Sequence, residues 1–172
     1  MNLWLRMLWI LFAASCAPRV DPTDPLRLRF RVMPTDLDIN LHMTNSRYFA
    51  FMDLGRMDLI LRCGLGPALR RDGWAPVIGG CMVQFRRPLA PFERFELTTE
   101  VKGCDEKWLY IEHRFSSARG LACVASVRGA FLRRGAIVPP ELVAARGGFR
   151  DHVGAVPDNL TAAWQGFRAA AE

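Results

Sequence analysis

Apolar and polar side chains alternate along residues 26–32, where leucine, phenylalanine and valine take turns with arginine. A period of two sends alternate side chains to opposite faces of an extended chain, so this pattern predicts a half-buried β-strand. Similar strand-like patterns recur in four later stretches, which are residues 77–87, 94–101, 107–115 and 121–133. In the clearest of them Phe95, Leu97, Thr99 and Val101 point one way, and Gly103 begins the turn that follows.

Residues 46–63 have a helical pattern of apolar residues and not an alternating one. They contain no proline, and apolar side chains occur nearly all round a wheel of 3.6 residues per turn, which predicts a buried α-helix. Thr44 or Asn45 can cap the start of this helix, and Gly64 suits its end. Asp58 and Arg62 are spaced to form an ion pair on one helix face.

The order of these elements is one strand, one long apolar helix and four further strands joined by short turns. An antiparallel sheet must then cover the helix to bury both, which is the arrangement of an α+β hotdog domain. We therefore expect a long central helix wrapped by a sheet of at least five strands, over residues 26–134.

Residues 1–17 form an apolar amino-terminal segment, residues 18–25 a linker, and residues 135–172 an extension that is partly helical near 160–171. The apolar run is interrupted by Arg6 and falls short of the roughly 20 residues that a spanning helix needs. We expect a helix that makes peripheral membrane or partner contact through residues 1–15. A signal sequence ending near Cys16, or a helix packed on its own domain, are the alternatives.

The net charge of +6 favours anionic partners such as phosphates. Many arginines alternate with apolar residues along the expected strands, where a solvated face explains them equally well. Without an aromatic-basic motif, we expect no nucleic-acid binding. The five cysteines form no Cys-x-x-Cys pair and the histidines lack zinc-ligand spacing, which indicates a reducing, cytoplasmic location and no metal.

The segment between the first strand and the helix carries the candidate chemistry, with Asp38, Asn40 and His42 close together in sequence. Backbone N–H groups at a helix start are unpaired and lie at the positive end of the helix dipole, so they can polarise a carbonyl or hold an oxyanion. A carboxylate and an imidazole just upstream make a plausible hydrolytic site. The competing interpretation is that Asp36, Asp38 and Asn40 make turn bonds while His42 caps or packs against the helix.

The run Asp38-x-Asn40-x-His42-Met43-x-Asn45-x-x-Tyr48 resembles the Asp-x-Asn-x-His-Val-Asn-Asn-x-x-Tyr signature of hotdog thioesterases, including plant acyl-carrier-protein thioesterases. From about residue 26 to 131 the chain also resembles 4-hydroxybenzoyl-CoA thioesterase-like proteins, a group with small bacterial members and the thioesterase superfamily member six proteins of animals. The similar segments are Arg62-Cys63-Gly64, Phe85-Arg86-Arg87, Arg94-Phe95-Glu96-Leu97 and Pro139-Pro140-Glu141-Leu142.

The resemblance implies a thioester hydrolase that acts on acyl-CoA or on an acyl carrier protein. Asp38 would be the general base or the nucleophile, Asn40 would hold water or the thioester oxygen, and His42 would orient groups or relay a proton. N–H groups near Asn45 would stabilise the oxyanion. Among the substrate-binding residues, Asn45 is joined by Tyr48 and by two arginines that could reach the phosphates of the coenzyme, Arg86 and Arg87.

No cofactor is expected, because coenzyme A is part of the substrate. We expect a homodimer or a dimer of dimers, since a single hotdog leaves its sheet edges and groove incomplete.

The sequence departs from the plant enzymes at Pro88, which stands where they carry an additional glutamate. Asp38 with His42 could suffice, another acid such as Asp53 could substitute, or the protein could be a non-catalytic acyl-CoA-binding or scaffold protein. A hotdog enoyl-CoA hydratase is a further alternative, although its usual Asp-x-Asn-Pro-x-His spacing is one residue longer than the spacing here.

Overall fold

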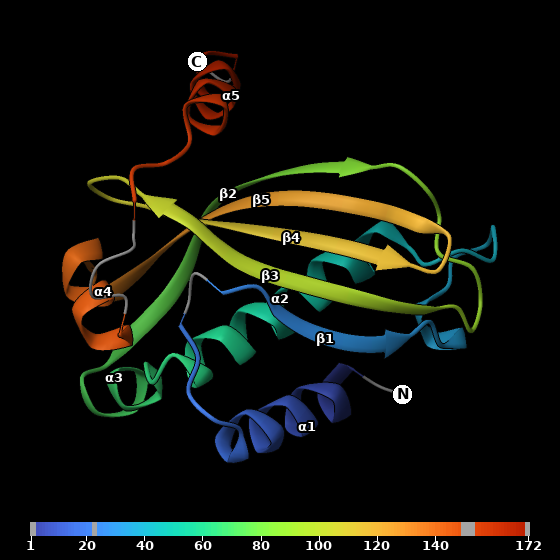
Figure 1. The fold of residues 1–172 in the computed structure, drawn as a ribbon, viewed down its shortest axis with the longest axis horizontal. Coiled ribbons are helices and arrows are strands. Elements are labelled where there is room, and N and C mark those ends of the chain that lie inside the picture. Colours follow the sequence, from blue (N-terminus) through green and yellow to red (C-terminus); the bar gives the residue numbers. More distant parts are fainter. Residues whose placement is uncertain (1–2, 22–23, 149–153, 171–172) are drawn as a thin grey trace.

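The computed structural model describes residues 3–21, 24–148 and 154–170 of the chain, and its core is one antiparallel sheet around a helix (Figure 1). The strands are β1 (Leu26–Arg31), β2 (Trp74–Phe85), β3 (Arg94–Cys104), β4 (Leu109–Ser117), β5 (Gly120–Arg133) and β6 (Ala136–Val138). Their order is β1-β3-β4-β5-β2, and β6 pairs with β5. All five expected strands are present, and β2 occupies one end of the strand order.

Helix α2 (Asn45–Arg62) lies across the concave face of the sheet, which confirms the hotdog arrangement. The alternation along β3 is also confirmed, because Phe95, Leu97 and Thr99 are at most 3% exposed. Gly55 lets the helix approach closely, since a Cβ there would lie 2.4 Å from the hydroxyl of Thr99. Gly64 follows the helix with a φ of +81°, in the left-handed region that ends many helices.

Helix α1 (Leu3–Cys16) packs beside α2 on the side away from the sheet. Ile10 is fully buried and joins the same apolar core as Phe51 and Met52. The guanidinium of Arg6 lies 4.7 Å from the ring centre of Phe51. This cover explains why α2 is apolar nearly all round, because the helix is buried by the sheet on one side and by α1 on the other.

The opposite face of α1 is exposed, with Trp4, Leu8 and Phe12 at 74%, 60% and 71% of their surface. Within the described part of the chain, no helix has the length and apolar character needed to cross a membrane. The helix therefore presents one face to the domain and an apolar face outward.

The remaining helices lie at the ends of the sheet and on its outer face. They are the short turn η1 (Pro34–Asp36), α3 (Gly66–Arg71), α4 (Pro140–Gly147) and α5 (Asp158–Ala169). Trp164 of α5 is buried, donates a hydrogen bond to Ser126 over 3.1 Å and stacks on the guanidinium of Arg128 at 4.7 Å. The carboxy-terminal helix is thereby anchored on β5.

Candidate functional site

The loop before α2 holds the Asp38 carboxylate in a fixed turn. Its Oδ1 accepts hydrogen bonds from the backbone N–H groups of Asn40 at 2.9 Å and His42 at 3.3 Å. The N–H of Asp38 donates to the carbonyl of His42 at 2.9 Å, and Leu41 adopts a left-handed φ of 56°. The turn bonds expected for Asp38 are thus present, and both go to one carboxylate oxygen.

A cleft of about 340 Å³ lies at the amino-terminal end of α2 and is lined by this turn and by the residues that follow β2. Its lining combines six of the seven expected site residues with three others, as follows: Asp38, His42, Met43, Asn45, Tyr48, Phe85, Arg86, Arg87 and Pro88. Asn40 is exposed and lies outside this lining, and it contributes to the turn through its backbone N–H.

The turn is held in place by the buried carboxylate of Asp36. Both of its oxygens accept from the guanidinium of Arg6, at 3.0 and 2.7 Å, and Oδ2 also accepts from the N–H of Met33. The carbonyl of Asp36 accepts from the N–H of Thr44, the residue that precedes α2. Helix α1 therefore fixes both ends of the loop that carries Asp38, a role that the sequence pattern did not reveal.

Tyr48 forms the floor of the cleft and belongs to the core. Its ring makes edge contacts with Phe85 at 5.2 Å and Phe115 at 5.0 Å, and the residue is 2% exposed. Burial raises the pKa of its hydroxyl to about 12, so the group remains protonated at neutral pH.

The two arginines that follow β2, Arg86 and Arg87, differ in their exposure and in their hydrogen-bond partners. Arg87 donates to Ser117 at 2.7 Å, to the carbonyl of Gly120 at 3.0 Å and to Glu93 at 3.3 Å. Burial would raise the pKa of Glu93, but hydrogen bonds from Arg119, Ser117, the Ala90 N–H and Arg87 lower it to about 2. Arg87 thus braces the end of the sheet, whereas Arg86 is exposed and bonds to the side chain of Gln84.

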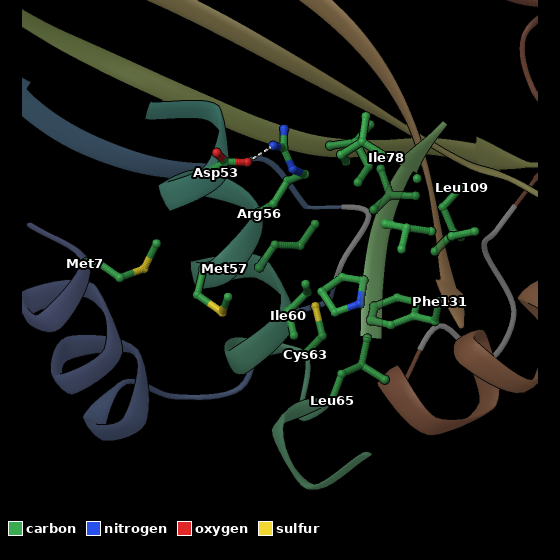
Figure 2. Close-up of a pocket in the computed structure, with 17 residues that line it drawn as sticks. Met7, Asp53, Arg56, Met57, Ile60, Cys63, Leu65, Ile78, Leu109 and Phe131 are labelled. Atoms are coloured by element: carbon green, nitrogen blue, oxygen red, sulfur yellow. Dashed lines mark hydrogen bonds and ion pairs between the residues drawn. The ribbon is translucent and has the colours of Figure 1, made fainter. Parts of the chain in front are cut away.

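A second cavity, of about 300 Å³, lies between α2 and the strands β2, β4 and β5 (Figure 2). Asp53 and Arg56 lie at one end of it as an ion pair, and Leu65 lies at the other. Asp53, raised above as a possible substitute acid, therefore lines this cavity and not the cleft of Asp38. The spacing of Asp53, Arg56, Met57 and Ile60 along one helix face was the available sequence signal.

The guanidinium of Arg56 also reaches His113, a fully buried residue of β4, with 3.2 Å between Nη1 and Nε2. The other ring nitrogen of His113 lies 3.0 Å from the hydroxyl of Thr99. Burial, followed by the nearby Arg56 charge, holds the pKa of His113 well below 6.5, so the imidazole is neutral. The described residues include no group of three or more histidine, cysteine or acidic side chains arranged to hold a metal ion.

A sheet wrapped round one long helix, with a carboxylate turn at the amino-terminal end of that helix, places the chain in the hotdog class. Comparison with known families is more specific. The chain belongs to the thioesterase-like superfamily, whose sequence profile matches residues 32–146.

Among curated proteins, THEM6 of Xenopus laevis is 40% identical over 84 residues, which are 49% of this chain and 41% of that protein. THEM6 of Danio rerio is 37% identical over 117 residues, 66% of this chain and 57% of that protein. The matched region thus spans about half the length of these relatives.

Solved structures share the fold at low sequence identity. The probable thioesterase of Bartonella henselae has a TM-score of 0.62 at 17% identity, covering 67% of this chain and 98% of that one. A 4-hydroxybenzoyl-CoA thioesterase variant in complex with 4-hydroxybenzoyl-CoA has a TM-score of 0.61 at 16% identity, covering 67% and 91%. These likenesses confirm the expected hotdog fold.

Proposed function

We propose that this protein hydrolyses the thioester of an acyl-CoA or acyl carrier protein to a free acid and a thiol. The observation that carries the proposal is the cleft at the amino-terminal end of α2, in which Asp38, His42 and Asn45 meet. Family membership supports it, as do the names of structural neighbours that act on 4-hydroxybenzoyl-CoA and gentisyl-CoA. Both coenzyme A and the carrier arm remain candidate thiols.

In the proposed reaction the thioester carbonyl faces the unpaired N–H groups at the start of α2. Asp38 takes a proton from water as the water oxygen bonds to the carbonyl carbon, and the helix end stabilises the resulting oxyanion. The C–S bond then breaks, the thiolate accepts a proton, and the acid is released. His42 lines the same cleft and is placed to orient water or relay that proton.

The alternative role of Asp38 is that of a nucleophile. Its carboxylate oxygen would bond to the carbonyl carbon, the thiolate would leave, and water would split the mixed anhydride. Intact-protein mass measured after rapid quenching separates the two roles, because only the nucleophile gains the mass of the acyl group. Loss of that added mass in Asp38→Asn would assign it to this residue.

Thiol release from a panel of acyl-CoA substrates tests the proposal itself. Asp38→Asn keeps an oxygen for the turn bonds but loses the basic carboxylate, so we expect thiol release to fall by roughly 100-fold or more. Asp158→Asn, an exposed residue in the first turn of α5, is the matched control and should retain the wild-type rate.

Equal rates in Asp38→Asn and wild type would refute the assigned role. Acyl-CoA binding by calorimetry without thiol release would establish the non-catalytic alternative, and water addition to crotonyl-CoA without thiol release would establish the hydratase. The last two outcomes would each replace hydrolysis with one of the alternative functions.

A homodimer through β2 is part of the proposal, because β2 is a terminal strand with much of its first half exposed. In an antiparallel pair of β2 strands, the end of one strand lies beside the start of the other. Phe85 lines the Asp38 cleft, and Ile78 lines the apolar cavity. Pairing would therefore bring the cleft of one copy toward the cavity of the other.

We also propose that the exposed face of α1 contacts an anionic membrane surface. Tryptophan and phenylalanine favour the membrane interface. The surface groove that includes Trp9 is lined by one acidic residue, Glu96, and by four arginines, of which Arg29, Arg31 and Arg94 are exposed and Arg6 is buried. Trp9→Ser with Phe12→Ser should reduce sedimentation with phosphatidylglycerol-containing vesicles at least several-fold, whereas Phe167→Ser on exposed α5 should not. Unchanged sedimentation of the α1 variant would contradict this contact.

A further inference from the structure

The cavity beside α2 changes in character from one end to the other. Asp53 and Ile78 are exposed at one end, which therefore opens beside the edge strand β2. The lining residues at the other end are apolar, and Leu65 and Phe131 among them are buried (Figure 2). The polar groups of the cavity are thus concentrated at its mouth, and its depth is apolar.

The guanidinium of Arg56, at the mouth of the cavity, has a hydrogen-bond partner on each of two sides. Asp53 accepts one of its N–H groups, and His113 Nε2 lies 3.2 Å from another. Because arginine is always charged and only donates, Nε2 must accept, and the imidazole carries its proton on Nδ1. That proton points to the hydroxyl of Thr99, 3.0 Å away.

These two contacts leave further N–H donors on Arg56, since the side chain has five. The Asp53 carboxylate balances the charge of Arg56, so the selection rests on hydrogen bonding: the remaining N–H donors need an acceptor oxygen, which a carbonyl or carboxylate offers and an ammonium group does not. Apolar residues line the rest of the cavity. A ligand that suits both the Arg56 donors and this apolar lining is an apolar chain with an oxygen at its head.

We propose that this cavity is a binding site for a medium-length acyl chain, whose head oxygen accepts a hydrogen bond from Arg56. The head is the thioester carbonyl of a substrate or the carboxylate of a released acid, and the first of these rests on the proposed hydrolysis. The cavity of about 300 Å³ holds a chain on the order of ten heavy atoms, at about 30 Å³ each. Arg56 is therefore the residue that selects the head group, and the buried end sets the chain length.

The proposed pairing of β2 strands suits this assignment, because it brings the Asp38 cleft of a second copy toward the cavity mouth. A thioester could then place its carbonyl between the Asp38 cleft of one copy and Arg56 of the other, while its acyl chain enters the cavity. Binding of the free acid needs only the cavity itself, so it can be measured independently of hydrolysis.

Calorimetry with octanoate and octylamine, two chains of equal length and opposite charge, tests the head-group selection. The wild-type protein should bind octanoate at least ten times more tightly than octylamine. Arg56→Met should lose this preference, with octanoate affinity falling at least tenfold. Arg114→Met, an exposed arginine on β4, is the matched control and should bind octanoate like the wild type.

Ile60→Phe tests the chain-length assignment without touching the charged cluster, because it places a larger apolar side chain in the cavity. We expect decanoate binding to be lost and butanoate binding to be retained. Thermal melting of each variant checks that it folds.

Equal octanoate affinity in wild type and Arg56→Met, or decanoate binding unaffected by Ile60→Phe, would overturn the inference. Failure of the proposed hydrolysis gives a different result, in which thiol release is absent while octanoate still binds through Arg56. The two proposals can therefore fail separately.

Discussion

His113 is a single residue whose environment makes the stability of the whole protein depend on pH. Its imidazole is fully buried against Arg56 and Thr99, and its pKa lies well below 6.5 in the folded state. In the unfolded chain the same group takes up a proton below about pH 6.5. Unfolding therefore binds a proton in acid, and the free energy of unfolding falls as the pH drops below 6.5.

We expect this fall to reach about 1.4 kcal/mol per pH unit in the window between 6.5 and the lowered pKa. Urea unfolding measured from pH 7.5 to 5 gives the slope. His113→Leu should lower stability at all pH values but reduce the acid slope, whereas Gln165→Ala, an exposed and non-titrating position on α5, should keep it. An unchanged slope in His113→Leu would show that other groups cause the acid sensitivity.

At the residue scale, the sequence predicted several of the residues that line one cleft. Asp38 and His42 are four residues apart, and one tight turn can bring them to a common cleft, so local spacing was sufficient. Arg87 lines the same cleft, and its guanidinium contacts Ser117 and Gly120, which are about thirty residues away. Side-chain partners at such separations are set by strand pairing, which spacing along the chain does not report.

Among the elements, α1 connects the start of the chain to the candidate site. The ion pair between Arg6 and Asp36 is almost completely buried, with 2.7 Å between the charged atoms. Removing one partner of a buried pair costs about 3–5 kcal/mol, and the lower end applies here because Arg47 Nε also lies 3.5 Å from the Asp36 carboxylate. Asp36 also bonds to Met33 and Thr44, at the two ends of its loop. We therefore expect the turn around Asp38 to loosen when the ion pair between Arg6 and Asp36 is removed.

Arg6→Met should therefore destabilise the protein by about 3 kcal/mol and reduce thiol release, as measured by urea unfolding and by the acyl-CoA assay. Arg27→Met removes an exposed ion pair with Glu96 and should cost at most about 1 kcal/mol. If both substitutions had the same small effect, α1 would not hold the site.

At the scale of the whole molecule, β2 lies at one end of the strand order, so its free edge is available to pair with a second copy, and we expect a dimer. The middle of β2 falls at Gly79 and Gly80, where a two-fold axis between paired strands would place Met82 of one copy opposite Val77 or Ile78 of the other. Met82→Glu would then place a charged group against an apolar side chain of the partner and leave the protomer intact.

Light scattering after size exclusion should give twice the chain mass of 19.4 kDa for the wild type and a single chain mass for Met82→Glu. Leu142→Glu, an exposed residue of α4, should remain dimeric. A wild-type monomer that still releases thiol would show that one chain completes the site.

The sequence by itself determined where the strands lie along the chain, the long apolar helix and the carboxylate turn before it, because alternation, helical periodicity and turn residues act over short distances. The tertiary structure decided what covers α2, where Asp53 points and which residue fixes Arg56. Arg6 meets Asp36 across 30 residues and Arg56 meets His113 across 57. A periodic pattern shows that a face is buried, but only folding decides which distant side chain buries it.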